Sequence, residues 1–261
     1  MRQVSSADGT TIAYELLGEG RPVIVVGGAT CDRARMRGVS SALAEHFAVV
    51  NYDRRGRGDS GDTQPFTPER EVEDLAALIE AAGGRASLYG HSSGSAVVLR
   101  AVVAGLPVER FVMHEPPYGP EPDDEARDYH RELHRLLAED RRGDAIALFF
   151  SGTGMPDEML DEMRASPMWA SLEALAPTLA YDSAAMADDK GGGVPHELLA
   201  AAPAVPGLVL IGGDSPDWFL DAGRAIAAGL PDGTFRELPG EDHVVEPERL
   251  APVLREFLAA G

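Results

Sequence analysis

The chain has 261 residues, of which 44% are hydrophobic, and its single cysteine, Cys31, excludes an internal disulfide framework and a cysteine-rich metal site. Its formal net charge of −20 excludes a broadly basic surface, so nucleic acid is not an expected partner. The sequence contains no run of about 18 or more apolar residues, and its first residues lack an apolar signal segment, so we expect no membrane span and a cytoplasmic location.

The first third of the chain predicts a β-hairpin, two buried strands and two helices. The dipeptide Asp8-Gly9 between two extended segments is typical of a hairpin turn. Continuous apolar runs, as at 23–26, are typical of central strands that are covered on both faces. Thr67 as cap and Pro68 as first residue begin the second helix, and a glycine pair ends it. In chain order, the expected elements are strands at 4–6, 11–17, 23–26 and 47–52 and helices at 37–46 and 67–82.

A loop rich in charge and glycine, Asp53 to Gly61, follows the second buried strand. Its Asp and Arg side chains predict a structural turn that is held by ion pairs. The alternative is an anion-binding site, because several arginines gather in one loop.

A serine framed by glycines lies between the next strand, at 86–89, and the next helix, at 96–103. The pattern is G-x-S-x-G with Ser92 at its centre, and Gly90 and Gly94 provide the lack of bulk that a sharp strand-to-helix turn requires. Centring the pattern on a neighbouring serine loses both glycines. A strand, a sharp turn and a helix with serine at the apex predict an exposed nucleophile.

The alternation of strands and helices stops after a strand at 110–114 and resumes at 207–211. Between them, residues 119–202 are acidic and amphipathic and predict a helical cap, with three glycines at 191–193 as a flexible joint. Because the alternation resumes, we interpret the chain as a single domain, 1–261, with an inserted cap. The helices expected in the cap cover 123–140, 144–150, 156–164 and 167–175.

A helix at 217–229, a strand at 234–238 and a final helix at 246–260 complete the chain. This order predicts an α/β fold, a doubly wound and mostly parallel sheet with an antiparallel N-terminal edge. In such sheets, sites form beyond the carboxyl ends of the strands, so the loops that follow the strands are expected to meet at one edge.

A serine hydroxyl is a weak nucleophile unless a base takes its proton, and the chain offers seven histidines. His243 lies in a polar, glycine-containing loop after the last strand, and it is our candidate base. The other six are expected to lie as follows: His46 at the opposite edge, His91 fixed in the turn beside Ser92, His114 in the core, His130 and His134 on a solvated helix face without a third metal ligand, and His196 in the exit loop of the cap.

Together, the glycine-framed Ser92, the glycine loop after 23–26, the Asp53 to Gly61 loop and the late His243 resemble the α/β-hydrolase family. The resemblance covers nearly the whole chain outside the cap, and it implies a Ser-acid-His triad with a small-molecule substrate, no cofactor and no metal. Among the capped members of the family, the chain resembles most the esterases, thioesterases and lactonases. Serine at position 92 argues against epoxide or haloalkane hydrolysis.

Relatives in this family place the acid of the triad either after the strand that follows the elbow helix or after the next strand. Glu115 matches the first placement. Asp214 roughly matches the second, although Ser215 falls where the acid is expected, and Asp217 lies on the other side of that position. Asp214 has an alternative interpretation as a helix cap. We favour Glu115 and keep Asp214 and Asp217 as alternatives.

The resemblance also implies two backbone donors for a developing oxyanion. These are the N–H of Ser93, at the start of the elbow helix, and the N–H of Ala29, after a Gly27-Gly28 pair where relatives carry His-Gly. Without the elbow, that pair would be interpreted as a tight turn. Residues expected to contact the substrate are Gly28, His91 and Trp169. The apolar side chains of the cap are expected to form an acyl pocket or the inward faces of its helices: Phe149, Phe150, Met155, Met159, Met163, Met168 and Trp169.

The predicted function is hydrolysis of a carboxylic ester, a thioester or a lactone through an acyl-Ser92 intermediate. Because a fold does not fix the chemistry, two alternatives stay open. One is a lyase or cyclase reaction at the same site in a biosynthetic pathway, and the other is a catalytically silent, hydrolase-like binding protein. The oligomeric state is not predicted by the sequence.

Overall fold

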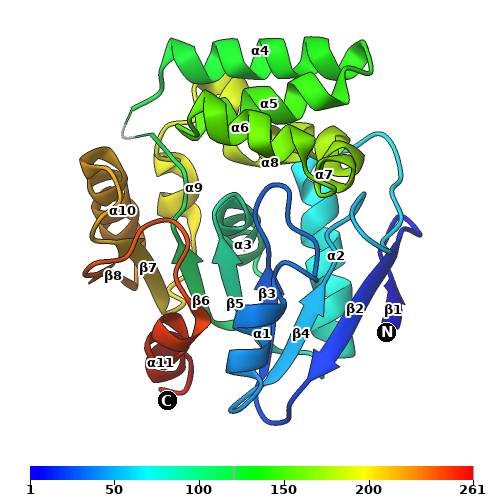
Figure 1. Ribbon diagram of the computed structural model, residues 1–261. Helices are drawn as coiled ribbons and strands as arrows, with labels where there is room; N and C mark the ends of the chain where they lie inside the picture. Colours follow the sequence, from blue (N-terminus) through cyan, green and yellow to red (C-terminus); the bar gives the residue numbers. More distant parts are fainter. Residues whose placement is uncertain (120, 261) are drawn as a thin grey trace.

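Within residues 1–119 and 121–260, which the computed structural model describes, eight strands form one sheet in the order β1-β2-β4-β3-β5-β6-β7-β8 (Figure 1). The strands are β1 (Arg2–Ser5), β2 (Thr11–Leu17), β3 (Pro22–Val26), β4 (Ala48–Tyr52), β5 (Ala86–His91), β6 (Val108–His114), β7 (Gly207–Gly212) and β8 (Gly233–Leu238). The helices that alternate with them are α1 (Arg37–Leu43), α2 (Pro68–Ala81), α3 (Gly94–Val103), α10 (Asp217–Gly229) and α11 (Pro247–Leu258).

The directions of the strands confirm the predicted doubly wound, mostly parallel sheet. β1 pairs with β2 and β2 pairs with β4 in antiparallel fashion, whereas the neighbours from β4 to β8 pair in parallel. Parallel strands end at the same edge of a sheet, and the loops that follow them form sites there. The loops after β3, β5, β6, β7 and β8 therefore meet at one edge.

The strands divide the apolar core into one layer on each face of the sheet. Ile24 of β3 packs in the cluster that includes side chains of α2, α3 and α10, whereas its neighbour Val25 packs in the cluster with α1 and α11. Successive side chains of a strand point to opposite faces, so a continuous apolar run contributes to both layers. This is why apolar runs located the central strands β3 and β4 within the sequence.

The segment between β6 and β7 folds into helices, and we call residues 121–202 the helical insertion. α4 to α8 lie over the carboxyl edge of the sheet (Figure 1). Buried side chains such as Leu133, Leu172 and Leu179 form a cluster within the insertion, and Ala29 of the loop after β3 packs against that cluster. The helices of the insertion are α4 (Asp124–Ala138), α5 (Arg142–Gly152), α6 (Asp157–Ala165), α7 (Trp169–Leu175), α8 (Leu179–Met186) and α9 (His196–Ala201).

Two helices of the insertion, α8 and α9, are missing from the sequence prediction. α8 is buried along most of its length, and its polar residues Asp182 and Ser183 are buried too. It therefore lacks the alternation of apolar and polar faces by which an amphipathic helix is recognised.

The glycines at 191–193, which are predicted as a flexible joint, lie where the backbone packs closely against Gly119 and Pro122. The Gly119 N–H donates to the Gly192 carbonyl at 3.0 Å, and Gly119 and Gly193 form an isolated β-bridge. A Cβ on Gly193 would lie 2.5 Å from the Pro122 nitrogen. These glycines therefore serve close backbone packing. Thr67 stands at the N-cap of α2 as predicted, but its side chain makes no capping hydrogen bond.

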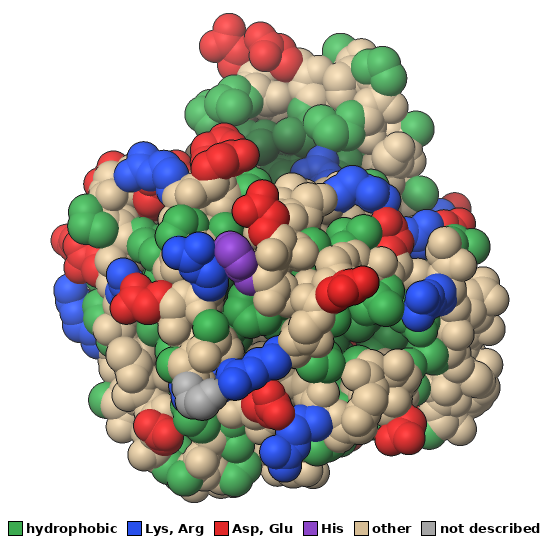
Figure 2. All heavy atoms as spheres, turned by 90° about the horizontal axis from the view of Figure 1, so that it is seen from below, with side chains coloured by type: hydrophobic (Ala, Val, Ile, Leu, Met, Phe, Trp, Pro, Cys, Tyr) green, Lys and Arg blue, Asp and Glu red, His purple; other side chains and the backbone are tan. Residues whose placement is uncertain are grey.

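On the face of the molecule seen in Figure 2, basic side chains are interspersed with aspartate and glutamate among hydrophobic and uncharged polar atoms. Among the residues described, no helix is both long and apolar enough to cross a membrane.

Candidate active site

Ser92 lies on a sharp turn between β5 and α3 that only small neighbours permit. Its φ of 54° is in the left-handed region, which is costly for a residue with a Cβ. A Cβ on Gly90 would lie 2.8 Å from the Gly94 carbonyl oxygen, and one on Gly94 would lie 2.4 Å from the Val26 carbonyl oxygen. The two glycines that frame Ser92 in the sequence are thus required by the packing of the turn.

Hydrogen bonds from the turn to β6 hold Ser92 in this conformation. The Ser92 N–H donates to the His114 carbonyl at 2.8 Å. The Ser95 hydroxyl donates to the Gly90 carbonyl at 3.0 Å and lies 3.3 Å from the His114 carbonyl. Backbone strain persists where the surrounding contacts over-determine the conformation, and such strain is frequent at active sites.

The structure brings Glu115 and His243 together at the edge where Ser92 lies. His243 Nδ1 is 3.2 Å from Glu115 Oε2. The other carboxylate oxygen of Glu115 accepts the Gly212 N–H at 2.5 Å and the Ser215 hydroxyl at 3.0 Å. Glu115 is fully buried and has a φ of 52°, whereas the His243 side chain is 42% exposed. A buried carboxylate held in this way can fix the imidazole tautomer with its proton on Nδ1.

Among the described residues, neither of the alternative acids, Asp214 and Asp217, makes a side-chain hydrogen bond or ion pair with His243, whose Nδ1 contacts Glu115. Both aspartate side chains are exposed, and the Asp214 backbone N–H donates to the Glu241 carbonyl at 2.8 Å. Ser215, which stands where relatives carry the late acid, donates its hydroxyl to Glu115. The geometry therefore favours Glu115 as the partner of His243.

Two further imidazoles lie beside His243. His91 Nε2 is 3.0 Å from the His243 carbonyl oxygen, and the His91 ring stacks at an angle between those of His243 and His114, with centroids 5.0 and 5.1 Å away. Burial and the nearby His243 lower the pKa of His91 to about 4, and burial also holds the pKa of His114 well below its usual value. Both rings are neutral at pH 7, so they add no positive charge beside the base.

The loop after β3 approaches Ser92 closely. A Cβ on Gly28 would lie 2.8 Å from the Ser92 Cβ and 3.4 Å from its Oγ. Among the residues that the structure describes, the N–H groups of Ala29 and Ser93 donate no hydrogen bond to a protein acceptor. Two unpaired backbone donors at this edge have the chemistry of an oxyanion hole.

Three arginines of the Asp53 to Gly61 loop are buried. The sequence alone indicated ion pairs in this loop but neither the burial of these arginines nor their partners. Arg54, Arg55 and Arg57 are each at most 1% exposed, and carboxylates pair with all of them. Two of the partners, Glu71 and Asp74, are buried on α2 among leucines. The sequence pattern that could have indicated this burial is the position of the two acids, which share a helix face with the apolar Leu75 and Leu78. Ion pairs therefore hold this loop, as predicted, and leave its buried arginines paired instead of open to an anion, but the pairing acids lie outside the loop and include a glutamate.

The remaining candidates differ in their surroundings. Trp169 packs, partly buried, against the cluster of the insertion together with Phe149, Phe150 and Met163, whereas Met159 and Met168 are exposed. Burial raises the pKa of the Cys31 thiol, which disfavours a nucleophilic thiolate. His130 is not fully solvated, since its Nδ1 lies 3.0 Å from the Ser183 hydroxyl of α8. Within the described residues, no group of three or more His, Cys, Asp and Glu side chains is arranged to hold a metal ion.

Comparisons with known proteins agree with this architecture. A family model described as "Alpha/beta hydrolase family" matches residues 23–253. The crystal structure of an alpha/beta hydrolase from Sphaerobacter thermophilus superimposes with a TM-score of 0.86 at 44% identity, covering 98% of this chain and 99% of that one. A thermophilic esterase from Thermogutta terrifontis gives a TM-score of 0.76 at 24% identity, covering 99% and 97%.

The similarity to curated sequences is more local. The chain is 30% identical over 114 residues to the uncharacterized hydrolase YraK from Bacillus subtilis, which covers 41% of this chain and 42% of that one. The chain spans less than half of the length of the curated relatives that it matches.

Proposed function

This chain belongs to the alpha/beta hydrolase family, and from that premise we propose that it hydrolyses a carboxylic ester, a thioester or a lactone through an acyl intermediate on Ser92. The observation that carries this proposal is the contact between the buried Glu115 carboxylate and His243 Nδ1 at the edge that holds the strained Ser92 turn. A nucleophile, a base and an orienting acid are the three groups that such a reaction requires.

In the proposed first step, His243 Nε2 takes the proton of Ser92 as its Oγ bonds to the substrate carbonyl carbon. Glu115 holds Nδ1, so Nε2 is the ring nitrogen that remains to accept this proton. The tetrahedral intermediate collapses when His243 returns the proton to the leaving alkoxide or thiolate. Water then gives a proton to His243 as its oxygen bonds to the acyl carbon. The bond from that carbon to Ser92 Oγ breaks, His243 returns the proton to Oγ, and the carboxylic acid leaves.

The negative charge on the tetrahedral oxygen would be stabilised by the N–H groups of Ala29 and Ser93. Neither N–H has a protein acceptor among the residues that the structure describes, as an oxyanion hole requires. Gly28 supports this role because a side chain there would collide with Ser92. Loss of one such donor typically lowers kcat by about 10²–10³-fold.

We further propose that residues 119–202 act as a cap that shapes the substrate site, with Trp169, Gly28 and His91 near the substrate. Its support is the packing of Ala29, an oxyanion donor in this mechanism, against the apolar cluster of the insertion. The partly buried Phe149, Phe150 and Met163 belong to the same cluster and offer an apolar wall for an acyl group.

The test is a screen of p-nitrophenyl esters, acyl thioesters and lactones of increasing acyl length, run with the wild type and with Ser92→Ala. We expect turnover by the wild type and a loss of about 10⁴-fold or more in the variant. Activity that survives in Ser92→Ala would overturn the mechanism. If the wild type turns over none of these substrates, the hydrolytic proposal is wrong, and a lyase, cyclase or silent binding role takes its place.

A further inference from the structure

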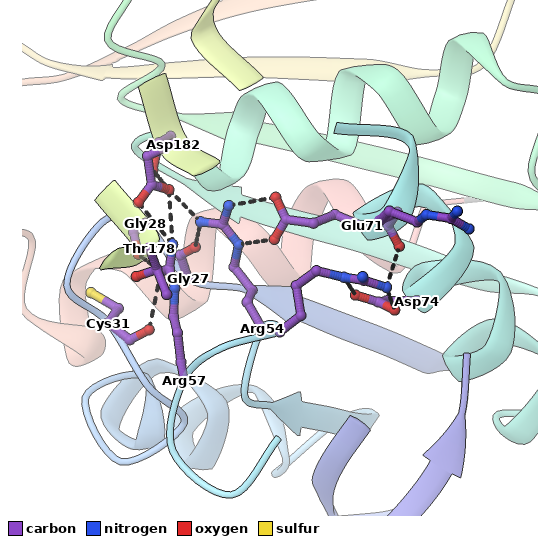
Figure 3. Close-up of polar contacts among 12 residues, drawn as sticks. Gly27, Gly28, Cys31, Arg54, Arg57, Glu71, Asp74, Thr178 and Asp182 are labelled. Atoms are coloured by element: carbon purple, nitrogen blue, oxygen red, sulfur yellow. Dashed lines mark hydrogen bonds and ion pairs between the residues drawn. The ribbon is translucent and has the colours of Figure 1, made fainter. Parts of the chain in front are cut away.

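A buried aspartate of the helical insertion, Asp182 on α8, contacts the catalytic edge of the sheet. Its carboxylate accepts hydrogen bonds from Arg54 Nη1 at 2.7 Å, from Arg57 Nη2 at 2.8 and 3.0 Å, and from the Ser93 hydroxyl at 2.8 Å. Figure 3 shows the two guanidinium groups converging on this carboxylate from the loop after β4. Asp182 is only 6% exposed, so these contacts are made out of reach of bulk water.

The same two arginines bind backbone carbonyls of the loop after β3. Arg54 Nη1 donates to the Gly27 carbonyl at 3.1 Å, and Arg57 Nη1 donates to the carbonyls of Gly28 and, at 3.2 Å, Cys31. Each guanidinium thus bridges the Asp182 carboxylate and a glycine carbonyl (Figure 3). The planar fork of arginine donors suits such bridging, whereas a lysine ammonium offers no fixed geometry.

Binding of the Gly28 carbonyl also determines where the Ala29 N–H points. The two groups belong to one peptide unit, which is planar and trans, so its C=O and N–H point in opposite directions. Arg57 donates to the Gly28 carbonyl from one side, where the Cys31 N–H also donates to it at 3.3 Å, and the Ala29 N–H is therefore directed to the other side. Rotation of this peptide would turn the carbonyl oxygen toward the position that the oxyanion donor must occupy.

We propose that Asp182 is a positioning residue for the oxyanion hole. Through Arg57 it fixes the peptide of Gly28 and Ala29, and through Arg54 it fixes the preceding peptide of Gly27 and Gly28. Through the Ser93 hydroxyl it also contacts the residue that supplies the second donor. This inference rests on the proposed function, because it assigns a role within the same reaction. The helical insertion then contributes to stabilising the transition state in addition to covering the substrate site.

The charges of the cluster support an ionised Asp182. Arg54 is paired on its other side with the buried Glu71 at 2.6 and 2.7 Å, so two guanidinium groups face two carboxylates. Burial acts to raise the pKa of Asp182, but Arg57, Arg54 and the Ser93 hydroxyl outweigh it and lower that pKa below its usual value. The carboxylate stays charged across the working pH range and keeps both arginines oriented.

The experiment compares Asp182→Asn and Arg57→Lys with a matched control, Tyr181→Phe, using an ester that the wild type hydrolyses. Tyr181 is the neighbouring residue on α8, and its hydroxyl donates to Asp62 at 2.6 Å and accepts from Gln64. The control therefore loses a contact between the insertion and the segment between β4 and α2, and it leaves the hydrogen bonds of the loop after β3 in place. Arg57→Lys keeps the positive charge and so avoids leaving Asp182 as an unpaired buried ion.

We expect both test variants to lower kcat by about 10²-fold, toward the effect of losing an oxyanion donor, while KM changes by less than about threefold. Tyr181→Phe should retain kcat. A second readout is the rate ratio between the ester and its thiono analogue, in which C=S replaces C=O. Sulfur is a weak acceptor, so hydrolysis of the thiono ester depends less on the donors and the ratio should fall in the test variants only.

Three outcomes would overturn the inference: a kcat within about threefold of wild type in folded Asp182→Asn and Arg57→Lys, an unchanged ester-to-thiono ratio, or an equal loss in Tyr181→Phe. If Asp182→Asn fails to fold, Arg57→Lys and the milder Ser93→Ala, which removes one hydrogen bond to Asp182, are measured instead. Failure of the proposed function looks different, because then the wild type shows no Ser92-dependent turnover against which the variants are compared.

Discussion

Charged side chains are held in opposite ways in the loops of the sheet edge and in the helical insertion. Arg54 and Arg57 are almost completely buried, and each donates to a carboxylate and to a backbone carbonyl. The arginines of α4 instead pair with carboxylates one turn away on their own helix, in solvent, as with Arg127 and Asp124 or Arg135 and Glu132. Exposed pairs of this kind contribute little to stability, whereas removing one partner of a buried pair is costly.

This difference shows which positions tolerate substitution least. At the sheet edge, Glu115 has three polar partners, and a change in any of them leaves a buried group unsatisfied. In the insertion, the side chains near the site are mainly apolar and partly buried, so they tolerate replacement by others of similar volume. In the proposed mechanism, the chemistry depends on the hydrogen-bonded groups of the sheet edge and the substrate preference depends on the apolar side chains of the insertion, and Asp182 joins the two regions.

The largest effect is expected at the sheet edge, between its buried acid Glu115 and its exposed acid Asp214. Glu115→Gln should lower kcat by about 10³–10⁴-fold. The amide NH₂ can donate to His243 Nδ1, which favours the tautomer with its proton on Nε2, and the neutral amide cannot stabilise the imidazolium. Asp214→Asn, at an exposed position after β7, should stay within about threefold of wild type. Steady-state kinetics on one activated ester measures both variants. A larger loss in Asp214→Asn than in Glu115→Gln would reverse the assignment.

A second comparison concerns stability. Glu71→Gln removes the carboxylate that receives two hydrogen bonds from the buried Arg54, and we expect the free energy of unfolding to fall by about 3–5 kcal/mol. Glu132→Gln breaks an ion pair with Arg135 in which both side chains are more than 40% exposed, and it should leave the free energy of unfolding close to that of the wild type. Urea denaturation monitored by tryptophan fluorescence measures both. Equal losses in the two variants would show that burial does not distinguish the two regions.

The smallest predicted effects concern pH, and they have opposite signs in the two regions. Burial and His243 lower the pKa of His91 to about 4, so between pH 6.5 and 4 the unfolded chain binds more protons and stability falls as the pH decreases. In the insertion, burial raises the pKa of Asp188 to about 7 despite its hydrogen bond with Ser183, so the stability that it contributes is present in acid and is lost as the pH rises toward 7.

We therefore expect the stability of His91→Gln to fall less than that of the wild type on acidification from pH 6.5 to 4, by roughly 1–2 kcal/mol. This difference is smaller than the full pKa shift would give, because the His91 side chain is partly exposed. Asp188→Asn should be more stable than wild type at pH 8 by a similar amount, with the difference shrinking toward pH 4. Denaturation midpoints across this pH range test both. Parallel pH profiles for wild type and His91→Gln would contradict the assignment of the acid response to this imidazole.

Much of the fold was predictable because the apolar runs of β3, β4 and β7 and the glycines around Ser92 report local requirements that act within a few residues. The helix α8 was not predicted, because it is buried and carries no exposed polar face, and the six-residue helix α9 was not predicted either. In the site, the motif and the loop position identified Ser92 and His243 as candidates. Glu115 could not be separated from Asp214 by spacing, since the choice depends on which carboxylate is buried against the loop of His243.

The network around Asp182 depends on contacts that join distant parts of the chain. Asp182 meets Arg54 across 128 residues and Ser93 across 89. No local pattern at Asp182 indicates these partners, and in sequence it is one acid among 43 acidic residues. The sequence does place Glu71 and Asp74 on the helix face of α2 that also carries its buried leucines, and acids on an apolar face indicate buried cations nearby.

The central claim, that Ser92 is a nucleophile activated by His243 and Glu115, is tested most directly by covalent trapping. The wild type is treated with a fluorophosphonate, whose phosphorus bonds to the attacking oxygen as fluoride leaves, and the adduct is mapped by peptide mass spectrometry. We predict a single adduct on Ser92 that is absent in Ser92→Ala and forms much more slowly in His243→Gln and Glu115→Gln. No adduct, an adduct on Cys31 or another residue, or equal rates in all variants would contradict the account.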